Sequence, residues 1–319
     1  MAANQESLTL PQRLLRHRKL RSLVIFAAIP YAAIVVLLTI FQRSLIYAPA
    51  HDLTLNLSLP NIPGAASNAV DVEATDKLVL HGWHITSRPA GGEAFDESVR
   101  KRLQGRPVIL YFCGNAGNRA YRAAEFELFA ELGADAICFD YRGFGDNAGQ
   151  PSEAAFAEDA RTIWRFVTEE LHITHKRIII FGESLGGGTA TRLAAELSAA
   201  GTPPGGLILR STFTRLTDVA AWHLPWLPVR WMLRDRYPSA DRIGQVTCPI
   251  MIVHGHRDTI VPFEEGEQLF AAAPMQSANG APKHFVDLLH AHHNDVLDAD
   301  RGLLRESMRE FVASVSTLD

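Results

Sequence analysis

The sequence predicts an α/β fold with a mostly parallel central sheet covered by helices on both faces. From residue 107 onward, short apolar runs that indicate strands alternate with longer segments of helical composition. The expected strands are apolar throughout, which is typical of strands buried on both faces of a parallel sheet. The length of 319 residues suits one large α/β domain with a short appendage.

A strand, a sharp turn and a helix are predicted around Ser184. The β-forming run 178–181 leads into Gly182-x-Ser184-x-Gly186, and a helix-forming segment follows over 189–200. A serine on such a turn has its hydroxyl exposed at the end of a sheet, and glycines are needed where the backbones pack closely. This context favours a nucleophilic serine over a glycine-rich turn that only packs a helix on a strand.

The remaining elements follow from apolar periodicity and turn residues. Two β-like runs with a polar break at Asp76 predict a hairpin, and the polar stretch 87–106 predicts an exposed loop. The expected strands are 70–75, 77–86, 107–113, 134–140, 177–182, 206–210, 249–254 and 283–289. The expected helices are 119–133, 152–172, 189–200, one that begins near residue 263, and 296–315.

The N-terminal region predicts a membrane anchor. Residues 1–21 are polar and basic, and 22–41 contain no charge over twenty residues, long enough to span a bilayer as a helix. Five Lys or Arg precede this run and only Arg43 follows closely, so the N-terminus is expected in the cytoplasm and the rest of the chain on the other side. We expect a connector over 42–69 and the main domain over 70–319.

One stretch interrupts the strand and helix rhythm. Residues 211–246 lie between two expected strands and contain Trp222, Trp226 and Trp231. An insertion there lies over the carboxyl ends of the strands, where ligands bind in open α/β sheets. We interpret it as a small cap whose apolar side chains line an acyl pocket over Ser184. The alternatives are an ordinary long crossover, or tryptophans that face the bilayer surface.

A serine nucleophile needs a histidine base and an acid that orients it, and on this type of scaffold they follow the serine in the order acid, then histidine. Asp258 follows the expected strand 249–254, at the end of the sheet that Ser184 shares. His290, His292 and His293 follow the final expected strand, and spacing alone does not choose between them.

The oxyanion of an acyl-transfer intermediate needs two backbone N–H donors. Leu185, directly after the serine, supplies the first. The glycine-containing loop 113–118 follows an early strand, and Asn115, or Ala116 beside it, is the expected second donor. The alternative is a flexible glycine loop without this role.

Composition excludes several other classes. The net charge of −4 and the absence of a basic stripe beyond residue 21 argue against a nucleic-acid partner. Five histidines could converge, but they have no cysteine at zinc spacing and no H-E-x-x-H motif, so we expect no metal; they are His254, His256, His290, His292 and His293. Cys113, Cys138 and Cys248 lie at or near the ends of expected core strands and are interpreted as small buried hydrophobes.

Several motifs in the expected order resemble those of membrane-anchored α/β-hydrolases of the bud-emergence-protein type, close to the serine-aminopeptidase-like hydrolases. They cover nearly everything after residue 44, and they are 45–47, 114–118, 140–145, 151–153, 182–187, 211–214, 254–258 and 293–295. The resemblance implies an α/β-hydrolase fold and a catalytic set of Ser184, Asp258 and His293. Where such families usually begin the glycine loop with histidine, this chain has Cys113, so a side-chain hydrogen bond that shapes the loop differs.

The resemblance implies a membrane-anchored serine hydrolase that cleaves an ester or thioester through an acyl-serine intermediate and needs no cofactor. Animal relatives of the family include protein depalmitoylases, which favours lipid-acyl or small-molecule substrates. An aminopeptidase-like amidase and a catalytically inactive, membrane-tethered scaffold are the alternatives. Fold resemblance alone does not decide between substrates.

Overall fold

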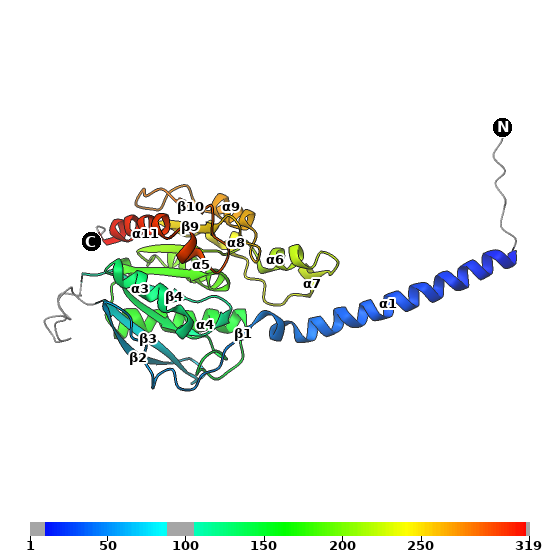
Figure 1. The fold of residues 1–319 in the computed structure, drawn as a ribbon, viewed down its shortest axis with the longest axis horizontal. Helices are drawn as coiled ribbons and strands as arrows, with labels where there is room; N and C mark the ends of the chain where they lie inside the picture. The colour runs from blue at the N-terminus through cyan, green and yellow to red at the C-terminus, as the bar shows by residue number, and fades with distance from the viewer. Residues whose placement is uncertain (1–9, 88–104, 317–319) are drawn as a thin grey trace.

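The structure, a computed structural model, describes residues 10–87 and 105–316, with side chains described from residue 21. Most of the loop expected over 87–106 and the first nine residues of the expected basic tail therefore lie outside the described residues. A long N-terminal helix extends away from a layered α/β domain (Figure 1).

An eight-stranded sheet forms the centre of the domain, in the order β10-β9-β8-β7-β4-β6-β3-β2. Along the sheet, each neighbouring pair of strands from β10 through β7 and β4 to β6 is parallel. Strand β3 is antiparallel to both β2 and β6. The eight strands are β2 (Ala65–Glu73), β3 (Val79–Ser87), β4 (Val108–Phe112), β6 (Asp135–Phe139), β7 (Ile178–Glu183), β8 (Gly206–Arg210), β9 (Ile250–Gly255) and β10 (His284–Leu288). The expected mostly parallel sheet is confirmed.

The strands bury alternate side chains on the two faces of the sheet, because successive side chains of a strand point in opposite directions. In β4, Leu110 belongs to a buried cluster that also contains residues of α4 (Glu153–Arg165), α5 (Leu185–Ala199), α8 (Ser239–Ile243) and α9 (Phe263–Ala272). Ile109 and Tyr111 of the same strand belong to a second cluster, with residues of α3 (Ala123–Glu131) and α11 (Arg301–Ser316), on the other face. Helices therefore cover both faces, as expected.

Short elements complete the domain. They are β1 (Ala48–Pro49), β5 (Ala116–Gly117), η1 (Arg119–Arg122), η2 (Phe166–Glu170), η3 (His175–Arg177), α6 (Leu216–His223), α7 (Val229–Met232) and α10 (Val296–Ala299). The stretch 211–246, between β8 and β9, thus contains α6, α7 and α8. In Figure 1, α6 and α7 project toward the long N-terminal helix.

That helix, α1 (Leu10–Ile46), is longer than the apolar run from which it was expected. Among the described helices it is the one long and apolar enough to cross a membrane, judged by length and composition over Arg21–Ile46. Pro30 lies inside it without ending it. The helix ends at Ile46, where a turn leads into β1.

Several elements differ from expectation. The helix expected over 152–172 is α-helical only to Arg165 and continues as the π-helix η2, and the helix expected over 119–133 begins as the 3-10 helix η1. The closing helix expected over 296–315 is divided at Asp300, which has the non-helical φ of −130°. Its carboxylate accepts hydrogen bonds from the backbone N–H and Nδ1 of His290, at 2.8 and 2.9 Å, at the point where the helix is interrupted. In the expected connector 42–69, β1 pairs with β5 and β2 already begins at Ala65.

Candidate active site

Ser184 lies at the turn between β7 and α5. Its backbone has φ of +50° and ψ of −117°, a conformation that is costly for a residue with a Cβ atom. The surroundings hold it: the Ser184 N–H donates to the carbonyl of Arg210 at 2.8 Å, and its own carbonyl accepts from the hydroxyl of Thr212 at 2.7 Å. The hydroxyl makes no capping hydrogen bond to the helix that begins at the next residue, so it is free for the contact with His293.

The glycines on either side of Ser184 are required by close backbone packing. A Cβ atom on Gly182 would lie 2.6 Å from the Cα of Gly187, and one on Gly186 would lie 2.1 Å from the carbonyl oxygen of Phe112. Both distances are far below van der Waals contact. The first turn of α5 can therefore pack against the end of β4 only because these positions have no side chain.

His293 lies between Ser184 and Asp258. Its Nε2 is 3.1 Å from the hydroxyl oxygen of Ser184, and its Nδ1 is 2.6 Å from Oδ2 of Asp258. The imidazole is largely buried, with 10% of its side chain exposed. The three residues come from the ends of β7, β9 and β10, which lie in one sheet. The geometry can thus pass a proton from the serine hydroxyl to an imidazole oriented by a carboxylate.

The other two histidines that spacing left open lie elsewhere. His290 contacts Asp300, and its side chain is 65% exposed. His292 is exposed, and its backbone N–H donates to Asp295 at 2.6 Å. Of the three, His293 is the one that contacts Ser184.

Asp258 is fixed on several sides. Its Oδ1 accepts the backbone N–H groups of Ile260 and Val261, both at 2.8 Å. Its Oδ2 faces His293 and lies 3.4 Å from Nε2 of the buried His254. Burial acts to raise the pKa of the Asp258 carboxyl, but the hydrogen bonds from His254 and His293 outweigh it and hold that pKa well below its usual range. The group is therefore a carboxylate at neutral pH.

The residues expected to supply the oxyanion donors, Leu185 and Asn115, come from the start of α5 and from the loop after β4. Leu185 is the first residue of α5, where backbone N–H groups have no partner within the helix. The loop that holds Asn115 leaves β4, whose end packs directly against Gly186. The side-chain amide of Asn115 donates to the carbonyl of Ile46, the last residue of α1. The loop beside the serine is thus tied to the end of the N-terminal helix.

A buried charge network under the turn was not expected from the sequence. The carboxylate of Glu183 accepts a hydrogen bond from the Tyr111 hydroxyl and forms 3.1 Å ion pairs with Arg122 and Arg210. Burial acts to raise the pKa of Glu183, but the two guanidinium groups outweigh it and lower that pKa. The only sequence signal for this network is the acidic residue between Gly182 and Ser184. Its three partners come from separate elements, so the sequence does not identify them.

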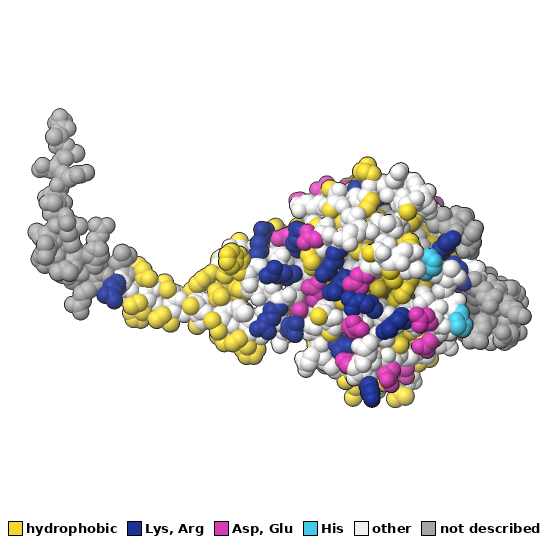
Figure 2. All heavy atoms as spheres, turned by 180° about the vertical axis from the view of Figure 1, so that it is seen from behind, with side chains coloured by type: hydrophobic (Ala, Val, Ile, Leu, Met, Phe, Trp, Pro, Cys, Tyr) yellow, Lys and Arg dark blue, Asp and Glu magenta, His cyan; other side chains and the backbone are white. Residues whose placement is uncertain are grey.

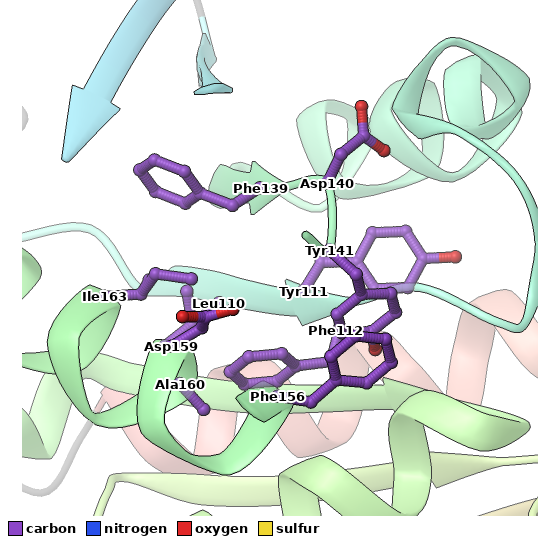
Figure 3. A pocket seen from close by; sticks show the side chains of 10 residues that line it. All are labelled: Leu110, Tyr111, Phe112, Phe139, Asp140, Tyr141, Phe156, Asp159, Ala160 and Ile163. Carbon is purple, nitrogen blue, oxygen red and sulfur yellow. The ribbon is translucent and has the colours of Figure 1, made fainter. Parts of the chain in front are cut away.

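The tryptophans expected over Ser184 lie on the surface. Trp222, Trp226 and Trp231 are 57%, 55% and 89% exposed, so they do not close an acyl pocket. Beneath the sheet end, β4, β6 and α4 enclose a cavity of about 10 Å³ (Figure 3). That volume is about the space needed for a single water molecule, too small for an acyl chain. Asp140, at its edge, turns its carboxylate away toward Arg119.

Asp140 and Arg142, in the motif 140–145, both form ion pairs. Asp140 binds the fully buried Arg119, and Arg142 binds Asp159 and Asp76. The three cysteines are buried and form no disulfide; the sulfur atoms of Cys113 and Cys138 lie 3.2 Å apart. These residues lie outside the contacts that connect Ser184, His293 and Asp258.

Comparison with known proteins agrees with the fold. Residues 107–231 match the family model described as alpha/beta hydrolase fold. An uncharacterized protein of Mycobacterium tuberculosis is 35% identical over 308 residues, covering 94% of this chain and 98% of that protein. The lysophosphatidylserine lipase ABHD12 of Danio rerio is 37% identical over 226 residues, covering 64% of this chain and 58% of the lipase.

Among solved structures, an esterase of Pyrococcus furiosus superposes with a TM-score of 0.60 at 15% identity, covering 84% of this chain and 98% of the esterase. An acylaminoacyl peptidase of Pyrococcus horikoshii superposes with a TM-score of 0.56 at 15% identity, covering 79% of this chain and 42% of the peptidase. At these identities the likeness shows the fold alone. With the family model and the mycobacterial relative, it leads to one conclusion: the chain belongs to the alpha/beta hydrolase family.

Proposed function

We propose that this hydrolase is a membrane-anchored serine enzyme that cleaves acyl esters or thioesters through an acyl-serine intermediate. The observation that carries the proposal is the continuous contact from Ser184 Oγ through His293 to Asp258, with distances of 3.1 and 2.6 Å. A serine hydroxyl is a weak nucleophile at neutral pH, and a neighbouring imidazole held by a carboxylate activates it.

In this mechanism, Oγ of Ser184 attacks the substrate carbonyl carbon while His293 Nε2 takes the hydroxyl proton. The carbonyl oxygen becomes an oxyanion that the backbone N–H groups of Leu185 and Asn115 would stabilise. The bond to the leaving alcohol or thiol then breaks, and the leaving group takes the proton from His293. Water, deprotonated by the same imidazole, hydrolyses the acyl-serine and restores the hydroxyl.

We further propose that residues 22–41 of α1 cross the membrane, with 1–21 in the cytoplasm and 70–319 forming the catalytic domain on the other side. The uncharged run and the excess of Lys and Arg before it support this orientation. The motifs shared with the bud-emergence-protein type of anchored hydrolase support a relationship to that group. The lipase name of the ABHD12 relatives supports an acyl substrate within this family.

Hydrolysis assays on the full-length protein in detergent test the proposal. We expect turnover of p-nitrophenyl butyrate and of an acyl thioester, and loss of about 10⁴-fold or more in kcat for Ser184→Ala. Ser307→Ala, on the partly exposed face of α11, is the matched control and should keep wild-type activity. Undiminished turnover in Ser184→Ala would contradict the serine mechanism.

The same assays separate the competing functions. Faster cleavage of alanine p-nitroanilide than of either acyl substrate would move the function to an amidase. A folded protein that cleaves none of the three substrates would contradict the enzyme and favour a scaffold. The likeness to the peptidase of Pyrococcus horikoshii, at 15% identity, shows only a shared fold and therefore does not favour the amidase.

A further inference from the structure

We infer that the segment 222–233 is embedded in the lipid bilayer beside α1, so that the candidate active site opens toward membrane lipid. The inference rests on the proposed membrane span and goes beyond it, because α1 alone would anchor the domain without any part of the domain entering the membrane. The first observation is an exposed apolar surface on this segment. Four large apolar side chains of this segment are substantially exposed, namely Trp222, Leu224, Trp226 and Trp231.

The segment has both buried and exposed apolar side chains. Leu227, Val229 and Leu233 are less than 10% exposed, whereas the three tryptophans are more than half exposed. Soluble surfaces rarely expose contiguous large apolar groups, and when they do the patch marks a binding surface. Tryptophan in particular is enriched where protein meets the interface of a bilayer.

The segment packs against α1 at a definite depth. The Tyr31 hydroxyl donates to the carbonyl of Trp226 at 2.9 Å. Tyr31 lies about 15 Å along the helix from Arg21 and about 18 Å from Arg43, at 1.5 Å per residue. These two arginines bound a charge-free stretch whose length matches the hydrocarbon core of a bilayer. When that stretch crosses the membrane, Trp226 is carried into the acyl-chain region with it.

A second contact lies closer to the membrane surface. Gln42 is buried, its side chain donating to the carbonyl of Met232 at 3.2 Å and accepting from the N–H of Arg234 at 2.7 Å. Val35, Leu38 and Thr39 are the partly buried residues of the same helical stretch, at the spacing of one helix face. The contact between α1 and the segment thus continues along about two to three helical turns.

The backbone of the segment is suited to a medium without water. In lipid, backbone polar groups must find partners within the protein. Pro225 and Pro228 have no N–H to satisfy, and the carbonyls of Trp226 and Met232 accept from α1 side chains. Four further backbone N–H groups donate to carbonyls inside the segment, those of Leu227, Trp231, Met232 and Leu233.

Charge is placed where lipid headgroups would lie. Arg234 and Arg236, just beyond the segment, are exposed, and Arg43 at the end of the charge-free run pairs with Asp235 at 2.8 Å. Arg230, inside the segment, pairs with Asp218 at 3.1 Å. Figure 2 shows hydrophobic side chains of α1 continuing onto the adjoining part of the domain, with Lys and Arg side chains gathered just beyond them. Basic groups bordering an apolar, tryptophan-rich surface are complementary to anionic lipid.

The embedded segment is joined to the candidate site. His223, at the end of α6, has its Nε2 2.9 Å from the carbonyl of Ile260. Ile260 in turn donates its N–H to Asp258, which holds His293. The substrate class that fits this placement is an acyl ester of a membrane lipid, which would reach Ser184 from the bilayer.

Probe depth in the full-length protein tests the inference. Trp226→Cys, Ile29→Cys in α1 and Leu303→Cys in α11 are each labelled with an environment-sensitive NBD fluorophore. Each protein is reconstituted into vesicles of phosphatidylcholine and phosphatidylglycerol at 3:1. The native cysteines are buried, so the unsubstituted protein serves as the labelling control. Ile29 and Leu303 are 62% and 52% exposed, comparable with Trp226.

We expect the probes at 226 and 29 to emit at shorter wavelength than the probe at 303 and to be quenched at least twofold by doxyl groups on lipid chains. Aqueous emission and iodide quenching at 226, with the probe at 29 in lipid, would overturn the inference and leave the anchor intact. Aqueous behaviour at both 226 and 29 would overturn the anchor and the inference together. None of these readouts depends on catalysis, so the proposed hydrolase activity stands or falls separately.

Discussion

The guanidinium of Arg210 lies 3.1 Å from the carboxylate of Glu183 and 2.9 Å from that of Glu125, and all three side chains are at most 13% exposed. Glu183 immediately precedes the candidate nucleophile, so this pair connects the turn to β8. Removing one partner from a buried ion pair leaves an uncompensated charge, which costs far more than the pair itself contributes.

We therefore predict that Arg210→Met lowers the free energy of unfolding by about 3–5 kcal/mol. The expected result is a fall of roughly 6 °C or more in the thermal unfolding midpoint in detergent. Arg161→Met is the matched control, because Arg161 pairs with Glu196 on the surface, where both side chains are 37% exposed and such pairs contribute less than about 1 kcal/mol. Equal midpoints for the two variants would contradict the importance of the buried network.

The packing of α5 on β4 gives a second prediction. Gly186→Ala places a Cβ atom 2.1 Å from the Phe112 carbonyl, so the turn cannot form without backbone movement. We expect a poorly folded or inactive protein, measured by yield and circular dichroism. Gly302→Ala, where nothing lies within 4 Å of the new Cβ atom in α11, should fold normally and be as stable or up to about 1 kcal/mol more stable. A well-folded, active Gly186→Ala protein would show that the close approach is not required.

Asp135 gives a prediction about pH. Burial raises its pKa to about 6, although the backbone N–H of Ser87 donates to its carboxylate. Because the folded-state pKa lies above the unfolded value, the fold favours the protonated acid, and stability falls as pH rises from about 4 through 6. Asp135→Asn removes this titration, so its stability relative to wild type should improve by up to about 3 kcal/mol between pH 4 and pH 7.

The thermal midpoints of both proteins at pH 4.5, 6 and 7.5 check the prediction for Asp135. The quantity to follow is the difference between variant and wild type, because groups remote from Asp135 titrate equally in both. If the thermal midpoint of Asp135→Asn minus that of wild type stays constant or falls as pH rises, the sign of the predicted effect is contradicted.

Membrane topology can be measured directly. A reporter that is active only outside the cytoplasm, fused after Asp319, should be active if α1 crosses the membrane with its basic end inside. Moving the charge bias, by replacing Arg16, Arg18 and Lys19 with glutamine and adding two lysines after Ser44, should lower that activity. An inactive reporter on the unmodified chain, matched by activity of a cytoplasmic reporter at the same position, would reverse the proposed orientation.

The sequence predicted those features that depend on local patterns. Apolar runs located the parallel strands, and the glycines around Ser184 predicted a turn whose close packing the structure shows. Asp258 could be predicted because it follows a strand directly. The choice of His293 over His290 and His292 needed a family resemblance, since adjacent histidines in a loop differ only in where the backbone turns them.

Features built from distant contacts could not be predicted. The break in the closing helix lies at Asp300, whose carboxylate accepts a hydrogen bond from His290, and β1 is two residues long with its partner strand at Ala116–Gly117. The hydrogen-bond and ion-pair partners of Glu183 come from β4, η1 and β8. The exposure of the tryptophans in 211–246 depends on how that stretch packs against α1, which no local periodicity encodes.

The central claim is that Ser184 is a nucleophile activated by His293. Labelling of the full-length protein by a fluorophosphonate probe, followed by mass spectrometry of the modified peptide, tests it most directly. We predict rapid modification of Ser184 in the wild type and in His292→Ala, whose side chain is exposed, and loss of labelling by at least 10²-fold in His293→Ala. Labelling of a serine other than Ser184, or unchanged labelling in a folded His293→Ala protein, would contradict the account.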